Sequence, residues 1–178
     1  FRVDFAYQDK TRFDYWKRME FTSEQWSGLL EHCKRRGLIF LSSPFSKKSV
    51  EVLERLGVCA YKIGSGEALS GVLLDQIIPL QKPILLSFGM SFSSEIKNTV
   101  EKLQAADAEF AILQCTTQYP TSFETVGLNI VKEFLSLYQN PIGFSDHSGT
   151  VFPGLMAMAL GVSILEVHVT FDKRMFGP

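Results

Sequence analysis

Lys62 is a charged residue that stands within an apolar run. Cys59-Ala60-Tyr61 precede it and Ile63 follows it, after which the chain continues as Gly64-Ser65-Gly66-Glu67. A lysine that leaves a buried strand can hold a phosphate or a carboxylate, and the two glycines would let that anion approach backbone N–H groups. The alternative is a lysine whose stem packs on apolar surface while its ammonium group reaches solvent at the rim.

Serine hydroxyls recur in a similar position after other apolar runs. Four serines end or follow such runs: Ser43, Ser65, Ser87 and Ser145. A single serine is more often a turn or helix-cap residue than a ligand. Together with the lysine, however, the four hydroxyls predict an anion site.

Two histidines follow the last two apolar runs. His147 comes directly after Ser145-Asp146, and His168 alternates with Glu166 and Thr170. In a strand, this alternation puts the side chains of Glu166, His168 and Thr170 on one face. Two imidazoles with open coordination positions suit a divalent metal that also holds a substrate oxygen. The pair therefore predicts a metal site, with hydrogen-bonded core histidines as the alternative.

Strands that alternate with helices must position these residues. Apolar strand candidates begin near six residues: Leu38, Cys59, Pro83, Phe110, Ile142 and Ser163. Helical stretches lie between them at residues 49–56, 69–80, 94–106, 128–138 and 154–160. The alternation indicates βα units with a parallel sheet, whose reactive residues gather at the C-terminal ends of the strands. A preceding helix at residues 22–36 is predicted from a capping box of Thr22 with Gln25 and a hydrophobic staple of Phe21 with Trp26.

The number of βα units leaves two architectures open. Six units fit a doubly wound sheet, but they also fit most of a (βα)8 TIM barrel, which needs at least about 200 residues. If two units precede Phe1, the chain is a barrel that lacks its first quarter. The start without Met and the end at Gly177-Pro178, directly after a strand-like run, both suggest cut ends.

Composition excludes several classes of protein. Hydrophobic residues make up 46%, charged residues 21%, and the net charge is -1, which argues against a disordered chain and against nucleic acid as a partner held by a basic surface. The odd number of cysteines, without a CxxC pair, favours reduced core thiols in a cytoplasmic protein: Cys33, Cys59 and Cys115.

One segment is uncharged over almost the length of a membrane span. Residues 147–165 contain no Asp, Glu, Lys or Arg, and a span needs about 20 residues. Pro153, Gly154 and Gly161 interrupt this segment, however. We therefore expect a loop, a short buried helix and the start of a strand, and no membrane partner.

Five motifs follow one another in a characteristic order. They are Lys62-Ile-Gly-Ser-Gly-Glu67, Lys82-Pro-Ile-Leu-Leu-Ser-Phe-Gly-Met90, Cys115-Thr-Thr-Gln-Tyr-Pro120, Gly143-Phe-Ser-Asp-His-Ser148 and Glu166-Val-His-Val-Thr170. The ordered set resembles the catalytic barrel of the N-acetylneuraminate (sialic acid) synthase family over about residues 38–178, whereas residues 1–37 match loosely. The resemblance implies that residues 1–178 are a partial TIM-barrel catalytic domain with about six of eight βα units. The first two strands and a small C-terminal antifreeze-like domain would then lie outside the chain.

The resemblance also implies an activity and a set of site residues. Phosphoenolpyruvate would condense with an N-acylmannosamine-type sugar to give a nonulosonic (sialic) acid and phosphate. By position, six residues would hold the phosphate of phosphoenolpyruvate: Lys62, Ser65, Ser87, Ser145, Ser43 and Thr117. Glu67 and Tyr119 would contact the sugar, Glu166 would lie beside the reacting enol, and His147 and His168 would bind a divalent metal, typically manganese. The catalytic candidates are Lys62, Glu67 and Glu166, and the complete family protein forms a homodimer.

Several alternatives remain open. The family usually has Thr at the position of Phe88, and it often has a basic residue and Phe at Val167 and Val169, which bears on the choice of sugar. A synthase of legionaminic acid, pseudaminic acid or a spore-coat sugar is one alternative. A catalytically silent barrel that acts as a binding module is another, and a metal-dependent hydrolase is a third, although a hydrolase would need more carboxylate ligands.

Overall fold

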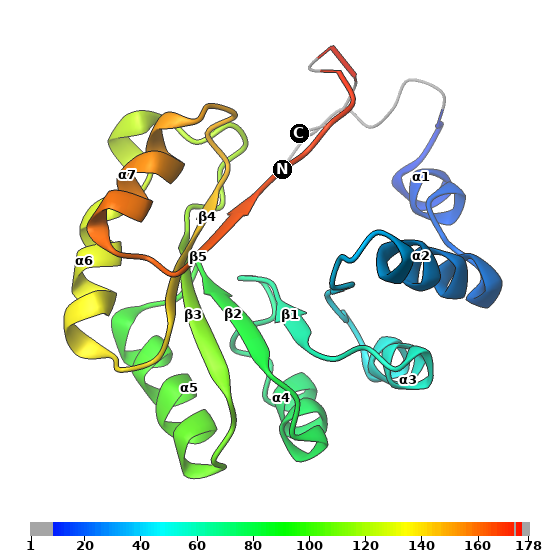
Figure 1. The fold of residues 1–178 in the computed structure, drawn as a ribbon, viewed down its shortest axis with the longest axis horizontal. Coiled ribbons are helices and arrows are strands. Elements are labelled where there is room, and N and C mark those ends of the chain that lie inside the picture. Colours follow the sequence, from blue (N-terminus) through cyan, green and yellow to red (C-terminus); the bar gives the residue numbers. More distant parts are fainter. Residues whose placement is uncertain (1–8, 173, 176–178) are drawn as a thin grey trace. The chain divides into compact units, whose positions relative to one another are not determined.

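The computed structural model describes residues 9–172, 174 and 175, and these fall into two compact units (Figure 1). One unit takes in the described residues up to Leu38 and from Val169 onward, and the other is Ile39–His168. Phe1 and Gly177-Pro178, on which the expectation of cut ends depends, lie outside the described residues.

The first unit contains helices α1 (Arg12–Arg18) and α2 (Ser23–Arg35). The predicted capping box of α2 is confirmed, because Gln25 N donates to Thr22 Oγ1 at 3.3 Å and Thr22 N donates to Gln25 Oε1 at 2.8 Å. The predicted staple is also present, with the Phe21 and Trp26 rings edge to face at 5.3 Å. Helix α1 was not predicted, because it buries no residue and so shows no apolar stripe.

The second unit contains a parallel sheet with strands in the order of the chain. The strands are β1 (Tyr61–Ile63), β2 (Ile84–Phe88), β3 (Phe110–Cys115), β4 (Ile142–Asp146) and β5 (Ile164–Val167). The helices are α3 (Lys47–Leu56), α4 (Gly71–Ile77), α5 (Ser93–Ala105), α6 (Leu128–Leu137) and α7 (Phe152–Leu160), with 3-10 turns at Ile78–Leu80 and Phe123–Thr125. Each strand pairs in parallel with the next.

The core of this unit lies between one face of the sheet and the helices. Alternate strand residues such as Ile63, Leu86 and Ile112 are fully buried with helix residues such as Leu103 and Val131. Figure 1 shows α4 to α7 outside the strands. A sequential strand order with the helices on one face is the arrangement of a TIM barrel, whereas a doubly wound sheet carries helices on both faces. The second unit is therefore part of a barrel.

The first of the six predicted strands is absent, and this prediction is corrected. Residues 38–45 form no strand, and Lys62 N to Ser42 O, at 3.3 Å, is the one backbone hydrogen bond that joins this segment to β1. A strand requires a ladder of such bonds, and one bond does not make a ladder. Within the described residues, the sheet has five strands and not six.

The uncharged segment forms the expected elements, but its helix is not buried as predicted. It folds into a loop, α7 and the start of β5, and no helix among the described residues is long and apolar enough to cross a membrane. Phe152, Leu155 and Met156 of α7 are 64%, 63% and 55% exposed. Helix α7 therefore presents an apolar outer face.

The three cysteines are free, as predicted, but only one belongs to the core. Cys115 is buried in β3, Cys33 is half-buried, and Cys59 is exposed. The expectation of core thiols is thus wrong for Cys59.

Candidate active site

The strand register places the predicted polar residues on the face of the sheet opposite the helices. Ser145 of β4 is paired with Cys115 of β3 on one side and with Glu166 of β5 on the other. Lys62 and Ser87 point to the same face, because their neighbours Ile63 and Leu86 belong to the core between sheet and helices. Since parallel strands end at one edge, these side chains converge there.

Lys62 is the centre of the polar contacts at this edge. Its ammonium group donates to Ser87 Oγ at 2.8 Å and to the carbonyl of Ile63 at 3.3 Å. It also forms an ion pair with Glu166 Oε1 at 3.5 Å, with the Lys62 side chain 13% exposed and the Glu166 side chain 37% exposed. Lys62 is thus held in the site and does not reach out to solvent at the rim.

A second pair of hydroxyls lies on the same side of the sheet. Ser65 Oγ and Thr117 Oγ1 are 3.0 Å apart and are hydrogen bonded. Both lie close to the buried thiol of Cys115 and oppose the rise in its pKa that burial causes. Gly89 makes this packing possible, because a Cβ at this position would lie 2.5 Å from Cys115 Sγ and 2.8 Å from Thr117 Oγ1.

The two predicted histidines lie together, and one of them contacts the Ser145 hydroxyl. The ring centroids of His147 and His168 are 5.1 Å apart. His147 Nδ1 is 2.8 Å from the carbonyl of Thr116, and its Nε2 is 3.3 Å from Ser145 Oγ. Because a carbonyl only accepts, Nδ1 carries the proton. The lone pair of Nε2 then accepts from the Ser145 hydroxyl and could bind a metal in place of this hydrogen bond.

The histidine pair fits a metal site that is completed by other ligands. Across residues 9–172, 174 and 175, no three His, Cys, Asp or Glu side chains gather in a way that could hold an ion. Two imidazoles would therefore leave the remaining coordination positions to substrate and water, as a metal that binds substrate oxygen requires. The backbone carbonyl behind His147 is the type of outer partner that metal-binding histidines usually have.

Burial at the site changes the acidity of several groups. Burial raises the pKa of Glu67, and the positive charge of Lys62 opposes this shift. Burial also raises the pKa of Tyr119, with smaller contributions from Cys115 and Glu166. The pKa of Cys115 is raised for the same reason, so its thiol stays protonated near neutral pH.

The structure does not bring every predicted residue into this cluster. Ser43 lies in the segment beside β1, and its hydroxyl makes no hydrogen bond within the described part of the chain. Strand β5 ends at Val167, so His168 and Thr170 lie beyond the strand on which they were predicted. Thr170 belongs to the first unit and donates to the carbonyl of Asp172 at 3.1 Å.

Sequence reasoning missed three residues that shape the site. Cys115 was taken for a plain core thiol, although its thiol lies beside the hydroxyls of Ser65 and Thr117. Thr116 was overlooked because its contribution is a backbone carbonyl. Gly89 follows the polar end of β2, and that position was the available signal, since glycines at such ends often allow close approach.

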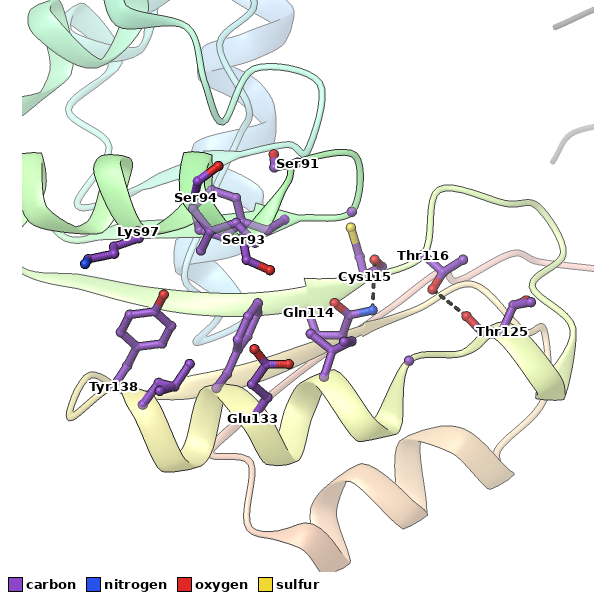
Figure 2. Close-up of a pocket in the computed structure, with 17 residues that line it drawn as sticks. Ser91, Ser93, Ser94, Lys97, Gln114, Cys115, Thr116, Thr125, Glu133 and Tyr138 are labelled. Atoms are coloured by element: carbon purple, nitrogen blue, oxygen red, sulfur yellow. Dashed lines mark hydrogen bonds between the residues drawn. The ribbon is translucent and has the colours of Figure 1, made fainter.

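A pocket lies on the helix side of the sheet, between α5 and α6 (Figure 2). It has a volume of about 520 Å³. Its walls include Ser93, Lys97 and Glu133, and hydrogen bonds within it join Gln114 to the carbonyl of Cys115 and Thr116 to the carbonyl of Thr125. None of the predicted site residues lines it. Gly89, Cys115 and Thr116, which shape the candidate active site, do line it, so the pocket adjoins that site at the ends of β2 and β3.

Comparison with known proteins gives consistent matches along the chain. The family model described as "NeuB family" matches residues 2–178. The chain is 35% identical to N,N'-diacetyllegionaminic acid synthase of Campylobacter jejuni, over 96% of this chain and 52% of that protein. It is 31% identical to human N-acetylneuraminate-9-phosphate synthase, over 94% of this chain and 47% of that protein. The chain thus spans about half the length of the curated relatives it matches.

A solved structure matches in the same way. The crystal structure of N-acetylneuraminic acid (sialic acid) synthetase from Leptospira borgpetersenii, in complex with citrate, superposes with a TM-score of 0.86. The identity is 28%, and the match covers 93% of this chain and 59% of that chain.

Proposed function

The chain belongs to the NeuB family, and from this premise we propose that it carries the phosphoenolpyruvate side of a sialic acid synthase-type active site. The proposed reaction condenses phosphoenolpyruvate with an N-acylmannosamine-type sugar to give a nonulosonic acid and phosphate. The observation that carries the proposal is the position of Lys62, which lies 2.8 Å from Ser87 Oγ and 3.5 Å from Glu166 Oε1 in a mostly buried setting.

The phosphate would bind at the hydroxyl-rich edge around Lys62. Four hydroxyls of the cluster would surround the anion with the ammonium group: Ser65, Ser87, Thr117 and Ser145. Ser43, in the segment beside β1, is proposed to add a fifth hydroxyl. A mostly buried ammonium group with hydroxyl donors stabilises an anion more strongly than an exposed lysine does, because the surrounding dielectric is low. In the absence of an anion, the carboxylate of Glu166 balances part of this positive charge.

The histidine pair would hold a divalent ion, for which Mn²⁺ is the proposed identity. Such an ion would supply a Lewis acid for the aldehyde oxygen of the open-chain sugar. His147 is prepared for this role because Thr116 O fixes its Nδ1 proton and so directs Nε2 toward the site. Glu67 and Tyr119 would contact the sugar itself.

The proposed chemistry balances with water as the one further reactant. The C3 carbon of phosphoenolpyruvate forms a bond with the aldehyde carbon, and water adds to C2. The C2–O bond to phosphate then breaks, which leaves a keto group at C2. The two protons of the water end on the new hydroxyl and on the departing phosphate. Glu166, held beside Lys62, is proposed to accept the proton that the water loses as it adds to C2.

The clustering of these residues disfavours the alternative of a silent barrel, because a binding module would not require a lysine, a glutamate and two histidines at one edge. The hydrolase alternative would require carboxylate ligands beside the histidines. Within the described residues, no group of three His, Cys, Asp or Glu side chains is placed to hold a metal ion.

Phosphate release by the complete polypeptide tests the proposal. The protein would be incubated with phosphoenolpyruvate, Mn²⁺ and a panel of N-acylated sugars: N-acetylmannosamine, its 6-phosphate, and the sugars that would give legionaminic and pseudaminic acids. We expect phosphate release with at least one sugar and an equimolar amount of the corresponding nine-carbon acid, detected by mass spectrometry. Release that does not depend on sugar would favour the hydrolase, and the absence of release with all four sugars would contradict the proposal.

A further inference from the structure

The loop that follows β3 surrounds His147 on three sides. The carbonyl of Thr116 accepts from His147 Nδ1 at 2.8 Å, and the backbone N–H of Thr121 donates to the carbonyl of His147 at 2.9 Å. Between these two contacts, the Tyr119 ring stacks on the imidazole, with centroids 4.3 Å apart and planes 30° apart. The loop thus holds the backbone, the ring nitrogen and the ring face of this residue.

The loop is itself fixed by its own hydrogen bonds. Thr121 Oγ1 donates to the carbonyl of Gln118 at 2.7 Å, and Thr116 Oγ1 donates to the carbonyl of Thr125 at 2.7 Å. These contacts hold the backbone on either side of Tyr119. The tyrosine ring is therefore presented from a supported position.

Tyr119 also contacts the second histidine. Its ring centroid is 5.6 Å from that of His168, and the two imidazoles are 5.1 Å apart, so the three rings form one cluster. His168 is exposed, and no hydrogen bond holds its imidazole within the described part of the chain. The rings of Tyr119 and His147 are thus the groups that contact this imidazole and can restrict its rotamers.

We infer that Tyr119 is a positioning residue that holds the imidazoles of His147 and His168 in the geometry needed to share one divalent ion. This inference rests on the metal site of the proposed function and goes beyond the sugar contact assigned to Tyr119. Two imidazoles bind one ion well only if both are already oriented, because each side chain that must be ordered on binding costs free energy. The flat tyrosine ring supplies this orientation, and its hydroxyl is not required for it.

The test is Mn²⁺ binding to the complete polypeptide. Binding is measured as the loss of the free Mn²⁺ signal in electron paramagnetic resonance. Tyr119→Phe keeps the ring, whereas Tyr119→Leu keeps apolar bulk without it. We expect the Phe variant to bind Mn²⁺ within about twofold of the wild type, and the Leu variant to bind about tenfold more weakly or worse, as for other residues that orient metal ligands. Equal Mn²⁺ affinities for the two variants would overturn the inference.

Three controls keep the outcomes separate. Phe123→Leu alters an aromatic residue of the same loop that packs on Phe152 and not on the histidines, so its Mn²⁺ affinity should not change. Inorganic phosphate binding should stay within about twofold in every Tyr119 variant, which shows that the Leu variant is folded. If His147→Ala keeps Mn²⁺ affinity, the metal site of the proposed function is wrong. If His147→Ala loses Mn²⁺ and Tyr119→Leu keeps it, only the positioning role is wrong.

Discussion

At the scale of single residues, Lys62 joins the proposed anion site to the proposed catalytic carboxylate. Its ammonium group contacts Ser87, Ile63 O and Glu166 at the same time. An arriving phosphate would compete with Glu166 for this charge. Binding of phosphoenolpyruvate and the position of Glu166 are therefore expected to depend on each other.

Lys62→Met should weaken phosphoenolpyruvate binding while the fold survives. The change removes the one ammonium group of the cluster and keeps the apolar stem, so we expect at least a tenfold loss of affinity, about 1.4 kcal/mol. Isothermal titration calorimetry on the complete polypeptide measures this loss. Lys102→Met is the control, because Lys102 lies outside the site and forms an ion pair with Asp75, with an N–O distance of 2.6 Å. A loss of less than about threefold for Lys62→Met would disprove the anchor.

Glu67 should make stability depend on pH in a defined direction. Burial raises its folded-state pKa above the ordinary value of 4.5, so the folded protein keeps this proton at pH values where the unfolded chain has lost it. Stability therefore falls as pH rises from about 4.5 through the raised folded pKa. Glu67→Gln removes this loss, so the Tm of the variant relative to wild type should increase across that window and stay constant above it.

Glu24 provides the opposite case. Hydrogen bonds from its own backbone N–H and from Thr22 lower its pKa, and such a carboxylate stabilises the fold above its unfolded pKa. The Tm of Glu24→Gln relative to wild type should thus decrease as pH rises. Thermal melts between pH 4 and pH 8 measure both variants, and the same sign for the two would show that the account of Glu67 is wrong.

The individual residues of the candidate site were partly predictable from sequence. Lys62, Ser87, Glu166 and the two histidines were predicted because each breaks or ends an apolar run. Thr116 was not predictable, since its carbonyl would be present whatever the side chain. Ser43 has the right residue type, but its hydroxyl forms no hydrogen bond with the others within the described residues, and the segment that carries it forms no strand.

At the scale of elements, strong local signals predicted structure well and isolated apolar runs did not. Helices α3, α5, α6 and α7 begin and end within two residues of the prediction, since caps and apolar periodicity are encoded locally. The run at residues 38–41 has the composition of a strand, but a strand depends on a partner far along the chain. The one backbone bond to β1 comes from Ser42, just after this run, so composition alone is not enough.

The end of β2 should tolerate no side chain at Gly89. Gly89→Ala would place a Cβ 2.5 Å from Cys115 Sγ and 2.8 Å from the carbonyl of Cys115. Overpacking of this kind costs about 1–3 kcal/mol, and it would also displace Thr117. We expect a lower Tm together with weaker phosphate binding.

Gly71→Ala is the matched control for this prediction. Gly71 opens α4, and a Cβ there would meet no atom within 4 Å. Its Tm should be unchanged or slightly raised, because Ala favours a helix. Equal Tm values for the Gly71 and Gly89 variants would contradict the close packing behind Cys115.

At the scale of the whole molecule, two surfaces are open to association. Strand β5 pairs only with β4 among the described strands, so one of its edges has no strand beside it. Helix α7 exposes an apolar face with Phe152, Leu155 and Met156. Unpaired strand edges and exposed apolar patches both favour self-association.

The 178-residue polypeptide should therefore self-associate at micromolar concentration. Leu155→Glu puts a charge into the apolar face of α7 and should shift the polypeptide toward monomer in sedimentation velocity. Gln104→Glu adds the same charge to an exposed position on α5 and should leave association unchanged. A polypeptide that is monomeric without any substitution would show that these surfaces do not drive association.

The position of the bridging oxygen of phosphoenolpyruvate after turnover tests the proposed synthase reaction most directly. The complete polypeptide would be given phosphoenolpyruvate with ¹⁸O between C2 and phosphorus, together with Mn²⁺ and the sugar that supports turnover. Because water is proposed to add at C2 and the C2–O bond to break, all of the label should leave with phosphate, and release should require the sugar. Label that stays in pyruvate, with phosphate released in the absence of sugar, would show hydrolysis at phosphorus and would contradict the account.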